Sequence, residues 1–251
     1  MAPPLAIRHA TFRFYAELND FLPPPRRSIA FTHDFELPAS VKDMIESMGI
    51  PHTEVDLVLV NGTPVDFSRV VQDGDRISVY PAFASPDVHP PRQLRPPLHK
   101  HRFVLDTHLG RLSTYLRLLG FDALYDTSWD DKALSQISAH DDRVLLTRDC
   151  GLLKRGEVVY GYFVRATAPK QQVIEVLRRF NLFSTVAPFR RCLRCNAVLK
   201  PVSKDSILER LPPRTREIYE EFLTCPSCNR IYWGGSHYAH MERFVQQILA
   251  G

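Results

Sequence analysis

Apolar and polar positions in the first third of the chain are spaced as strands and helices require. Residues 11–15 alternate between the two classes and residues 55–60 are mostly apolar, so both segments predict strands. Between them, Ser40 is placed to cap a helix that ends near Gly49. The inward face of this helix carries Val41, Met44, Ile45 and Met48. The pattern predicts a small α+β unit.

Turn signals complete this unit. Asn61-Gly62 and Asp73-Gly74 predict tight turns, and residues 76–80 predict the last strand. This order of elements resembles the β-grasp fold of ubiquitin-like sulfur carriers. Those carriers act through a C-terminal Gly-Gly, which does not follow the last strand here, so sulfur transfer is disfavoured. We expect residues 1–84 to form a β-grasp domain that binds or positions a partner, or one that only stabilises the fold.

The middle of the chain alternates short apolar runs with helical patterns. The strands are expected at residues 103–105, 143–147 and 157–164. One helix follows Asp106 and ends at Gly120, another covers residues 131–140, and a third begins at Pro169. Such alternation favours an α/β architecture, in which helices flank a parallel sheet.

Proline content marks the boundaries between these regions. Residues 85–100 contain five prolines and little apolar content, which is typical of an extended, semi-rigid spacer. A second boundary is expected near Pro188. We therefore predict a β-grasp domain, a linker, an α/β domain and a C-terminal domain. Their expected ranges are residues 1–84, 85–100, 101–187 and 188–251.

Two CxxC motifs dominate the C-terminal domain. Cys192 and Cys195 form the first, and Cys225 and Cys228 form the second. Four thiolates at this spacing can enclose a tetrahedral Zn²⁺ and leave no position open for water, so the metal would be structural. Two disulfides are the alternative. The 29 residues between the motifs indicate an insertion in this zinc ribbon.

Three aspartates are the candidate catalytic residues. Asp106 and Asp149 follow predicted parallel strands, and Asp131 begins the helix between them. Ligands of such sheets bind beyond the carboxyl ends of the strands. Converging carboxylates repel one another unless a divalent cation neutralises them, which favours Mg²⁺ or Mn²⁺ and phosphodiester hydrolysis. Each aspartate also has a simpler interpretation, as a helix cap or a turn residue, and Asp130 competes with Asp131 for the cap.

Charge is distributed unevenly around a formal net charge of +4. Residues 1–84 hold 7 Lys or Arg against 11 Asp or Glu, whereas residues 85–251 hold 25 against 17. The excess of basic residues in 85–251 favours an anionic partner such as nucleic acid. No apolar run reaches the ~18 residues that a membrane span needs. The N-terminal residues lack a secretory signal, and we expect a cytoplasmic protein.

The candidate motifs together resemble the Mut-seven C-terminal RNase family. The resemblance covers residues 101–241 and rests on FVLD ending at Asp106, LLTRD ending at Asp149 and both cysteine motifs. It implies a PIN-like nuclease fold, a zinc ribbon and metal-dependent ribonuclease activity. Asp106, Asp131 and Asp149 match acidic positions of the family, and a fourth acid would be Asp126 or Asp130. Longer members carry a ubiquitin-like domain in front.

Several cations are candidates to hold the RNA backbone, with solvated or ion-paired surface roles as the alternative. They are Arg111, Arg117, Arg148, Lys154 and Arg155. In the ribbon, Tyr232 and Trp233 either stack unpaired bases or pack against the sheet. The main hypothesis is a ribonuclease. The alternative is a non-catalytic RNA-binding adaptor whose β-grasp domain recruits a protein partner.

Overall fold

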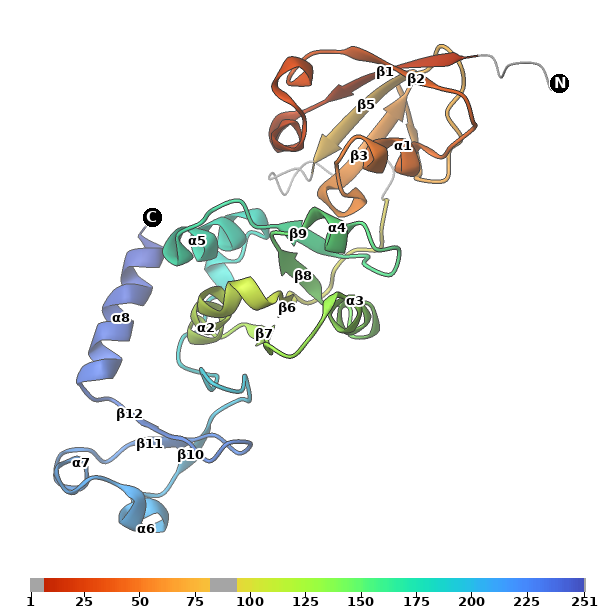
Figure 1. The fold of residues 1–251 in the computed structure, drawn as a ribbon. Helices are drawn as coiled ribbons and strands as arrows, with labels where there is room; N and C mark the ends of the chain where they lie inside the picture. The colour runs from red at the N-terminus through yellow and green to blue at the C-terminus, as the bar shows by residue number, and fades with distance from the viewer. Residues whose placement is uncertain (1–6, 82–93, 251) are drawn as a thin grey trace. The chain divides into compact units, whose positions relative to one another are not determined.

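The computed structural model describes residues 7–81 and 94–250 (Figure 1). The chain forms two compact units, and each contains segments that are distant in sequence. The first unit combines the chain up to residue 100 with residues 131–163. The second combines residues 101–130 with the chain from residue 164 onward. Among the described residues, no helix is long and apolar enough to cross a membrane.

A five-stranded mixed sheet forms the N-terminal part of the first unit. Its order is β2-β1-β5-β3-β4, with β1 parallel to β5 and the other pairs antiparallel. The strands are β1 (Arg8–Phe14), β2 (Phe31–Phe35), β3 (Val55–Val60), β4 (Thr63–Val65) and β5 (Arg76–Pro81). The Asn61-Gly62 turn joins β3 to β4, with both residues at positive φ. The expected mixed α+β domain is confirmed.

Helix α1 (Val41–Ser47) lies on this sheet and supplies its core (Figure 1). The helix begins as predicted, because the Ser40 Oγ accepts a hydrogen bond from the Asp43 N–H at 3.1 Å. Its buried residues Val41, Met44 and Ile45 join Phe12 and Phe14 of β1 in one apolar cluster. Burial of this face, rather than helix propensity, stabilises so short a helix.

The remainder of the first unit belongs to the α/β region. It contains α3 (Asp131–His140), β8 (Val144–Thr147), α4 (Cys150–Leu153) and β9 (Gly161–Phe163). Strands β8 and β9 pair in parallel, from Leu145 with Gly161 to Thr147 with Phe163. The third predicted strand, at residues 157–164, is thus shorter than expected, because Val159 is exposed while Gly161 and Tyr162 are buried.

The five-stranded sheet and its helix α1 are joined to this region by specific polar contacts. His52, which is buried, contacts the Val158 carbonyl oxygen through Nε2 at 2.8 Å and the Glu46 carboxylate through Nδ1 at 2.6 Å. The buried Glu54 carboxylate accepts a hydrogen bond from the Phe163 N–H at 2.7 Å. The buried His52 and Glu54 both have hydrogen-bond partners in this contact. The contact is therefore part of the fold of the first unit.

The end of the predicted linker is also attached to the first unit. Of residues 85–100, the structure describes 94–100, and Leu94 packs against the core of the five-stranded sheet. Arg95 donates hydrogen bonds to the carbonyl oxygens of Thr53, Val55 and Val159, and forms an ion pair with Asp56. Arg95 therefore connects β3 to the residues before β9.

The second unit contains β6 (Arg102–Leu105), α2 (Gly110–Leu118), β7 (Asp122–Leu124) and α5 (Pro169–Arg179). Strands β6 and β7 pair in parallel, and the sheet order is β7-β6-β8-β9. The expected parallel sheet flanked by helices is confirmed. The predicted stop at Gly120 follows the end of α2 at Leu118: φ is +96° at Gly120, and the Phe121 N–H donates to the Leu116 oxygen at 2.9 Å. These are the features of a Schellman cap.

The C-terminal ribbon is a three-stranded antiparallel sheet of order β10-β11-β12. Its strands are β10 (Lys200–Val202), β11 (Phe222–Thr224) and β12 (Ile231–Trp233). The predicted insertion contains two short helices, α6 (Lys204–Ile207) and α7 (Pro213–Ile218), and a small core of Ile207, Leu211 and Phe222. Helix α8 (Ser236–Leu249), which the sequence reading did not anticipate, follows β12.

Candidate functional site

The four predicted ligands of the ribbon lie together. The Sγ atoms of Cys192, Cys195, Cys225 and Cys228 are all within 4.8 Å of one another. Cys192 and Cys228 approach to 3.5 Å, and Cys195 and Cys225 to 3.3 Å. Thiolates around a tetrahedral zinc ion, with Zn–S of about 2.3 Å, stand roughly 3.8 Å apart. The donor set and its spacing therefore fit a metal ion, and the cluster could hold one.

Two similar turns bring the cysteines together. In the first, the Cys192 N–H donates to the Ala197 oxygen and the Asn196 N–H donates to the Cys192 oxygen. In the second, Cys225 and Asn229 make the equivalent bonds, with Arg230 as the acceptor for Cys225. Asn196 and Asn229 both adopt positive φ, at 70° and 58°, a conformation that asparagine tolerates better than most residues. The asparagine after each CxxC is therefore part of the motif.

Tyr232 adjusts the protonation of the first cysteine. Its hydroxyl lies 3.1 Å from the Cys192 Sγ and accepts a hydrogen bond from the Leu193 N–H at 3.3 Å. Burial raises the pKa of Cys192, but hydrogen bonds from Tyr232 and from the backbone of its turn outweigh burial and lower that pKa to about 6. Burial raises the pKa of Cys195 to about 12. Of the two interpretations of Tyr232, packing beside the cluster is the one that its contacts support.

Arg117, predicted as an RNA contact, is a buried residue of the second unit. Only 4% of its surface is exposed. Its Nε donates to the Ala123 oxygen at 2.8 Å, and its Nη1 donates to the oxygens of Leu193 and Arg194 at 3.1 and 2.8 Å. Burial lowers the pKa of Arg117, and the nearby Cys192, Cys195 and Asp122 act against this shift. We assign it a structural role, because its donors face carbonyl oxygens inside the protein.

A second set of polar contacts ties the first cysteine turn to β7. The Asn196 Oδ1 accepts from the Ala123 N–H at 3.0 Å, and its Nδ2 donates to the Asp122 carboxylate at 2.7 Å. Arg191 donates to the Gly120 oxygen and lies 3.6 Å from the same carboxylate. The ribbon is therefore anchored to the edge strand of the α/β sheet within the second unit.

Asp106 lies directly after β6 and is buried, with 7% of its surface exposed. Its Oδ1 accepts hydrogen bonds from the Thr107 N–H at 2.6 Å and the Thr107 hydroxyl at 3.1 Å. The residue thus caps a short 3-10 turn at Thr107–Leu109 that leads into α2. The backbone that follows β6 therefore fixes the position of this carboxylate.

Asp149 has a comparable position after β8. Its Oδ1 accepts from the Gly151 N–H at 2.6 Å and the Leu152 N–H at 3.4 Å, so it caps α4. The side chain is exposed, and the cap uses Oδ1. The cap explains why the chain turns sharply after the strand and presents a carboxylate there.

The other acidic candidates are exposed. Asp131 begins α3, and Asp130 precedes it. Asp126 accepts hydrogen bonds from the Ser128 N–H and hydroxyl, which lower its pKa. Asp106 belongs to the second compact unit, and Asp131 and Asp149 belong to the first. The convergence of these three carboxylates on one ion stays a prediction.

The remaining cationic candidates differ in exposure, and Lys154 and Arg155 are half-buried. Lys154 donates from Nζ to the Glu46 oxygen at 2.8 Å, which places it in the contact with the ubiquitin-like sheet. Arg155 donates to the Ser135 hydroxyl at 3.0 Å and the Glu157 carboxylate at 3.3 Å. Arg111 and Arg148 are exposed. Exposure leaves these last two as the better placed candidates for a phosphate contact.

Comparison with protein families assigns both parts of the chain. Residues 101–245 match the model of the Mut7-C RNAse domain, and residues 7–87 match the model of the Mut7-C ubiquitin domain. Comparisons with curated proteins and with solved structures find no match. The first family model covers the α/β sheet and the ribbon together, and the second covers the five-stranded sheet. The chain therefore belongs to the Mut7-C RNase domain family and carries the ubiquitin-like domain of that family in front.

Proposed function

We propose that this protein is a metal-dependent ribonuclease. The observation that carries the proposal is the family match over residues 101–245, which includes all three candidate aspartates. Asp106 and Asp149 each follow a strand of the parallel sheet, and each is fixed by hydrogen bonds to the backbone that comes after it. Ligand sites in such sheets lie beyond the carboxyl ends of the strands.

The donor chemistry fits a hard divalent cation. Asp106, Asp131 and Asp149 would hold Mg²⁺ or Mn²⁺, since both ions prefer carboxylate oxygens. An ion bound there would supply an activated water and neutralise charge on the phosphate. The protein itself fixes the carboxylates before substrate arrives: the Thr107 N–H orients Asp106, and the Gly151 N–H orients Asp149. Asp126 or Asp130 would provide a fourth carboxylate.

We propose that the exposed Arg111 and Arg148 hold backbone phosphates. Guanidinium groups pair with phosphate through two parallel hydrogen bonds, which gives orientation as well as attraction. Lys154 and Arg155 contribute less in this proposal, because both are half-buried. Arg117 is excluded from the set by its burial. Zinc in the Cys₄ cluster would be structural, because four thiolates complete its coordination.

The experiment is cleavage of end-labelled single-stranded and structured RNA with Mg²⁺, Mn²⁺ or excess EDTA, beside Asp149→Asn. Asparagine is as good a helix cap as aspartate, so this variant removes a charged ligand and keeps the cap of α4. Glu157→Gln, which changes an exposed carboxylate near α4, is the matched control. We expect metal-dependent cleavage that Asp149→Asn abolishes and Glu157→Gln retains.

Metal binding gives a second readout that does not depend on turnover. Titration of Mn²⁺ followed by its electron paramagnetic resonance signal should show one tight site in the wild type, weakened at least tenfold in Asp149→Asn. Equal Mn²⁺ affinity in the two proteins, or cleavage that survives both Asp106→Asn and Asp149→Asn, would overturn the site assignment.

An RNA-binding adaptor is the second candidate. The described part of the ubiquitin-like domain exposes four large aliphatic side chains, Ile7, Ile29, Leu37 and Val70, at 59%, 51%, 65% and 42% of their surface. Exposed apolar side chains on a small domain suit a protein partner. RNA that is bound but left uncut under every metal condition would favour this function over hydrolysis.

A further inference from the structure

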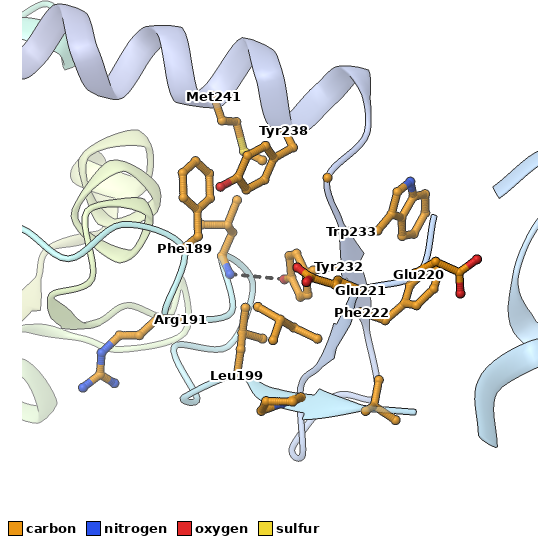
Figure 2. Close-up of a pocket in the computed structure, with 15 residues that line it drawn as sticks. Phe189, Arg191, Leu199, Glu220, Glu221, Phe222, Tyr232, Trp233, Tyr238 and Met241 are labelled. Carbon is orange, nitrogen blue, oxygen red and sulfur yellow. Dashed lines mark hydrogen bonds between the residues drawn. The ribbon is translucent and has the colours of Figure 1, made fainter. Parts of the chain in front are cut away.

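The ribbon contains a cavity that the proposed chemistry does not use. Its volume is about 710 Å³, and all of its walls come from the second unit. Phe189, Tyr238 and Met241 form one side, and the strands β11 and β12 form the other (Figure 2). Ligand pockets in proteins typically occupy about 300–1,000 Å³. The cavity is large enough for a nucleotide-sized group.

The walls are rich in aromatic rings. Phe189 and Tyr238 lie with their ring centroids 4.2 Å apart, and Tyr232 of β12 lies across from them (Figure 2). Trp233, the next residue of the strand, lies on the other side of β12 and packs against the small core of Ile207, Leu211 and Phe222 (Figure 2). Tyr238 is half-buried, so its ring face is partly accessible. Aromatic faces of this kind bind the π-face of an unpaired base. Tyr232 lines the wall while its hydroxyl is committed to the cysteine cluster.

Phe189 is held in an unusual backbone conformation. Its φ is +62°, which is disfavoured for a bulky side chain, and its N–H donates to the Leu118 oxygen at 3.0 Å. The neighbouring Ala187 N–H donates to the Leu119 oxygen in the same way. Strained residues persist where surrounding contacts impose them, and they concentrate at binding sites. Here the strain places an aromatic ring in the cavity.

The carboxylates that line the cavity favour the base of a nucleotide over its phosphate. Glu220 and Glu221 are exposed lining residues, so a phosphate would be repelled from the cavity. Glu220 forms an ion pair with Lys204 at 2.6 Å. Within the described residues the Glu221 carboxylate makes no hydrogen bond, which leaves it able to accept one from a ligand. The exposed Arg190 stands in sequence between the lining residues Phe189 and Arg191 and can meet the phosphate outside.

We propose that this cavity is a subsite for an unpaired nucleobase of RNA, stacked on Tyr238 and recognised by Glu221. The inference rests on the proposed function, since it requires an RNA partner. A carboxylate accepts a hydrogen bond from an exocyclic amino group, which adenine, cytosine and guanine have and uracil lacks. The subsite should therefore prefer adenine over uracil. Arg191 does not take part, because its guanidinium is turned toward Gly120, Asp122 and Asn196.

The test measures the binding of fluorescent oligoadenylate and oligouridylate by anisotropy, in the Asp149→Asn background so that no RNA is cut. Tyr238→Leu should weaken oligoadenylate binding about tenfold, the loss expected for one stacked base. Tyr115→Leu is the matched control. Tyr115 packs on α8 through Phe244, at a centroid distance of 4.4 Å, and lies outside the cavity. It should leave the affinity within twofold.

Two further measurements keep the proposal open to refutation. Glu221→Gln should reduce the preference for oligoadenylate over oligouridylate at least threefold, while the exposed Glu217→Gln should not. A 2-aminopurine base in the oligonucleotide should lose fluorescence on binding to the Asp149→Asn protein, and Tyr238→Leu in that background should reduce this loss. Melting temperature and metal content confirm that each variant is folded.

The outcomes separate this proposal from the ribonuclease itself. If the wild type cuts RNA but Tyr238→Leu binds as well as its parent, the subsite is refuted and the ribonuclease stands. If no RNA is cut but Tyr238→Leu binds adenylate more weakly than Tyr115→Leu, the subsite stands and catalysis is refuted. Equal binding of adenylate and uridylate by every variant would overturn the recognition by Glu221.

Discussion

Arg117 donates a hydrogen bond from Nη1 to the main-chain oxygen of Arg194 at 2.8 Å, which joins helix α2 to the first cysteine turn. Its two other acceptors are the oxygens of Leu193 and Ala123. One buried guanidinium thus satisfies three carbonyl groups on two different segments. Guanidinium donors lie in a fixed plane, so they also set the orientation of these segments.

Replacement of Arg117 by methionine should destabilise the second unit by about 2 kcal/mol or more, because buried carbonyl oxygens lose their donors. Thermal unfolding followed by circular dichroism measures this change. Arg111→Met is the control, since Arg111 is exposed on the same helix and should shift the melting temperature little. Equal melting temperatures for the two variants would contradict the structural role of Arg117.

Removal of the metal should unfold the ribbon, since structural metal sites contribute folding free energy directly. With a strong chelator, or in Cys228→Ser, the backbone amides of β10–β12 should lose protection from hydrogen exchange. Elemental analysis of the untreated protein should give one zinc per chain. Cys150→Ser is the control, because Cys150 lies outside the cluster. A ribbon that stays protected in Cys228→Ser would rule out this role for the metal.

Gly120→Ala should be among the more destabilising single substitutions in α2. The residue has φ of +96°, and an added Cβ would lie 2.2 Å from the Ala187 oxygen. Backbone strain and a clash with main chain act together, so we expect a loss of more than about 1 kcal/mol by urea unfolding. Gly156→Ala provides the comparison, because its Cβ meets nothing within 4 Å. Similar urea midpoints for the two variants would argue against the predicted strain.

Arg95→Ala should loosen the ubiquitin-like sheet from β9, because Arg95 bonds to Thr53 and Val55 on one side and Val159 on the other. We expect faster hydrogen exchange near Val159 and an earlier calorimetric transition for this part of the first unit. Arg76→Ala, an exposed substitution on β5, is the comparison. If Arg95→Ala unfolds in one transition at the wild-type temperature, the contact is not required for the fold.

Local signals explain which features the sequence predicted well. The Ser40 cap, the Asn61-Gly62 turn and the Gly120 stop each depend on one or two residues with a strong conformational preference. The CxxC spacing likewise predicts a turn at each pair of cysteines. The fold then brings the two turns together, so that the four thiols form one cluster. These interactions are short in sequence, so pattern and residue type suffice to find them.

Features defined by distant partners escaped the sequence reading. Strand β2 forms only because β1 lies beside it, and β7 is a three-residue strand at the edge of its sheet. The burial of Arg117 depends on carbonyl groups 76 and 77 residues away. The position of Arg117 between the apolar residues Leu116 and Leu118 of α2 does not predict these carbonyl acceptors. The cavity beside α8 was equally hidden, because its walls come from four separated segments.

The insertion between the two cysteine turns has a practical consequence for handling the protein. Each half of the ribbon contributes two of the four thiols, and the helices α6 and α7 lie in the chain between them. A single backbone cut near Arg214 should therefore leave two polypeptides that stay associated while metal is present and separate when it is chelated. Because each polypeptide carries two of the four thiols, two separately expressed chains should associate when zinc is added.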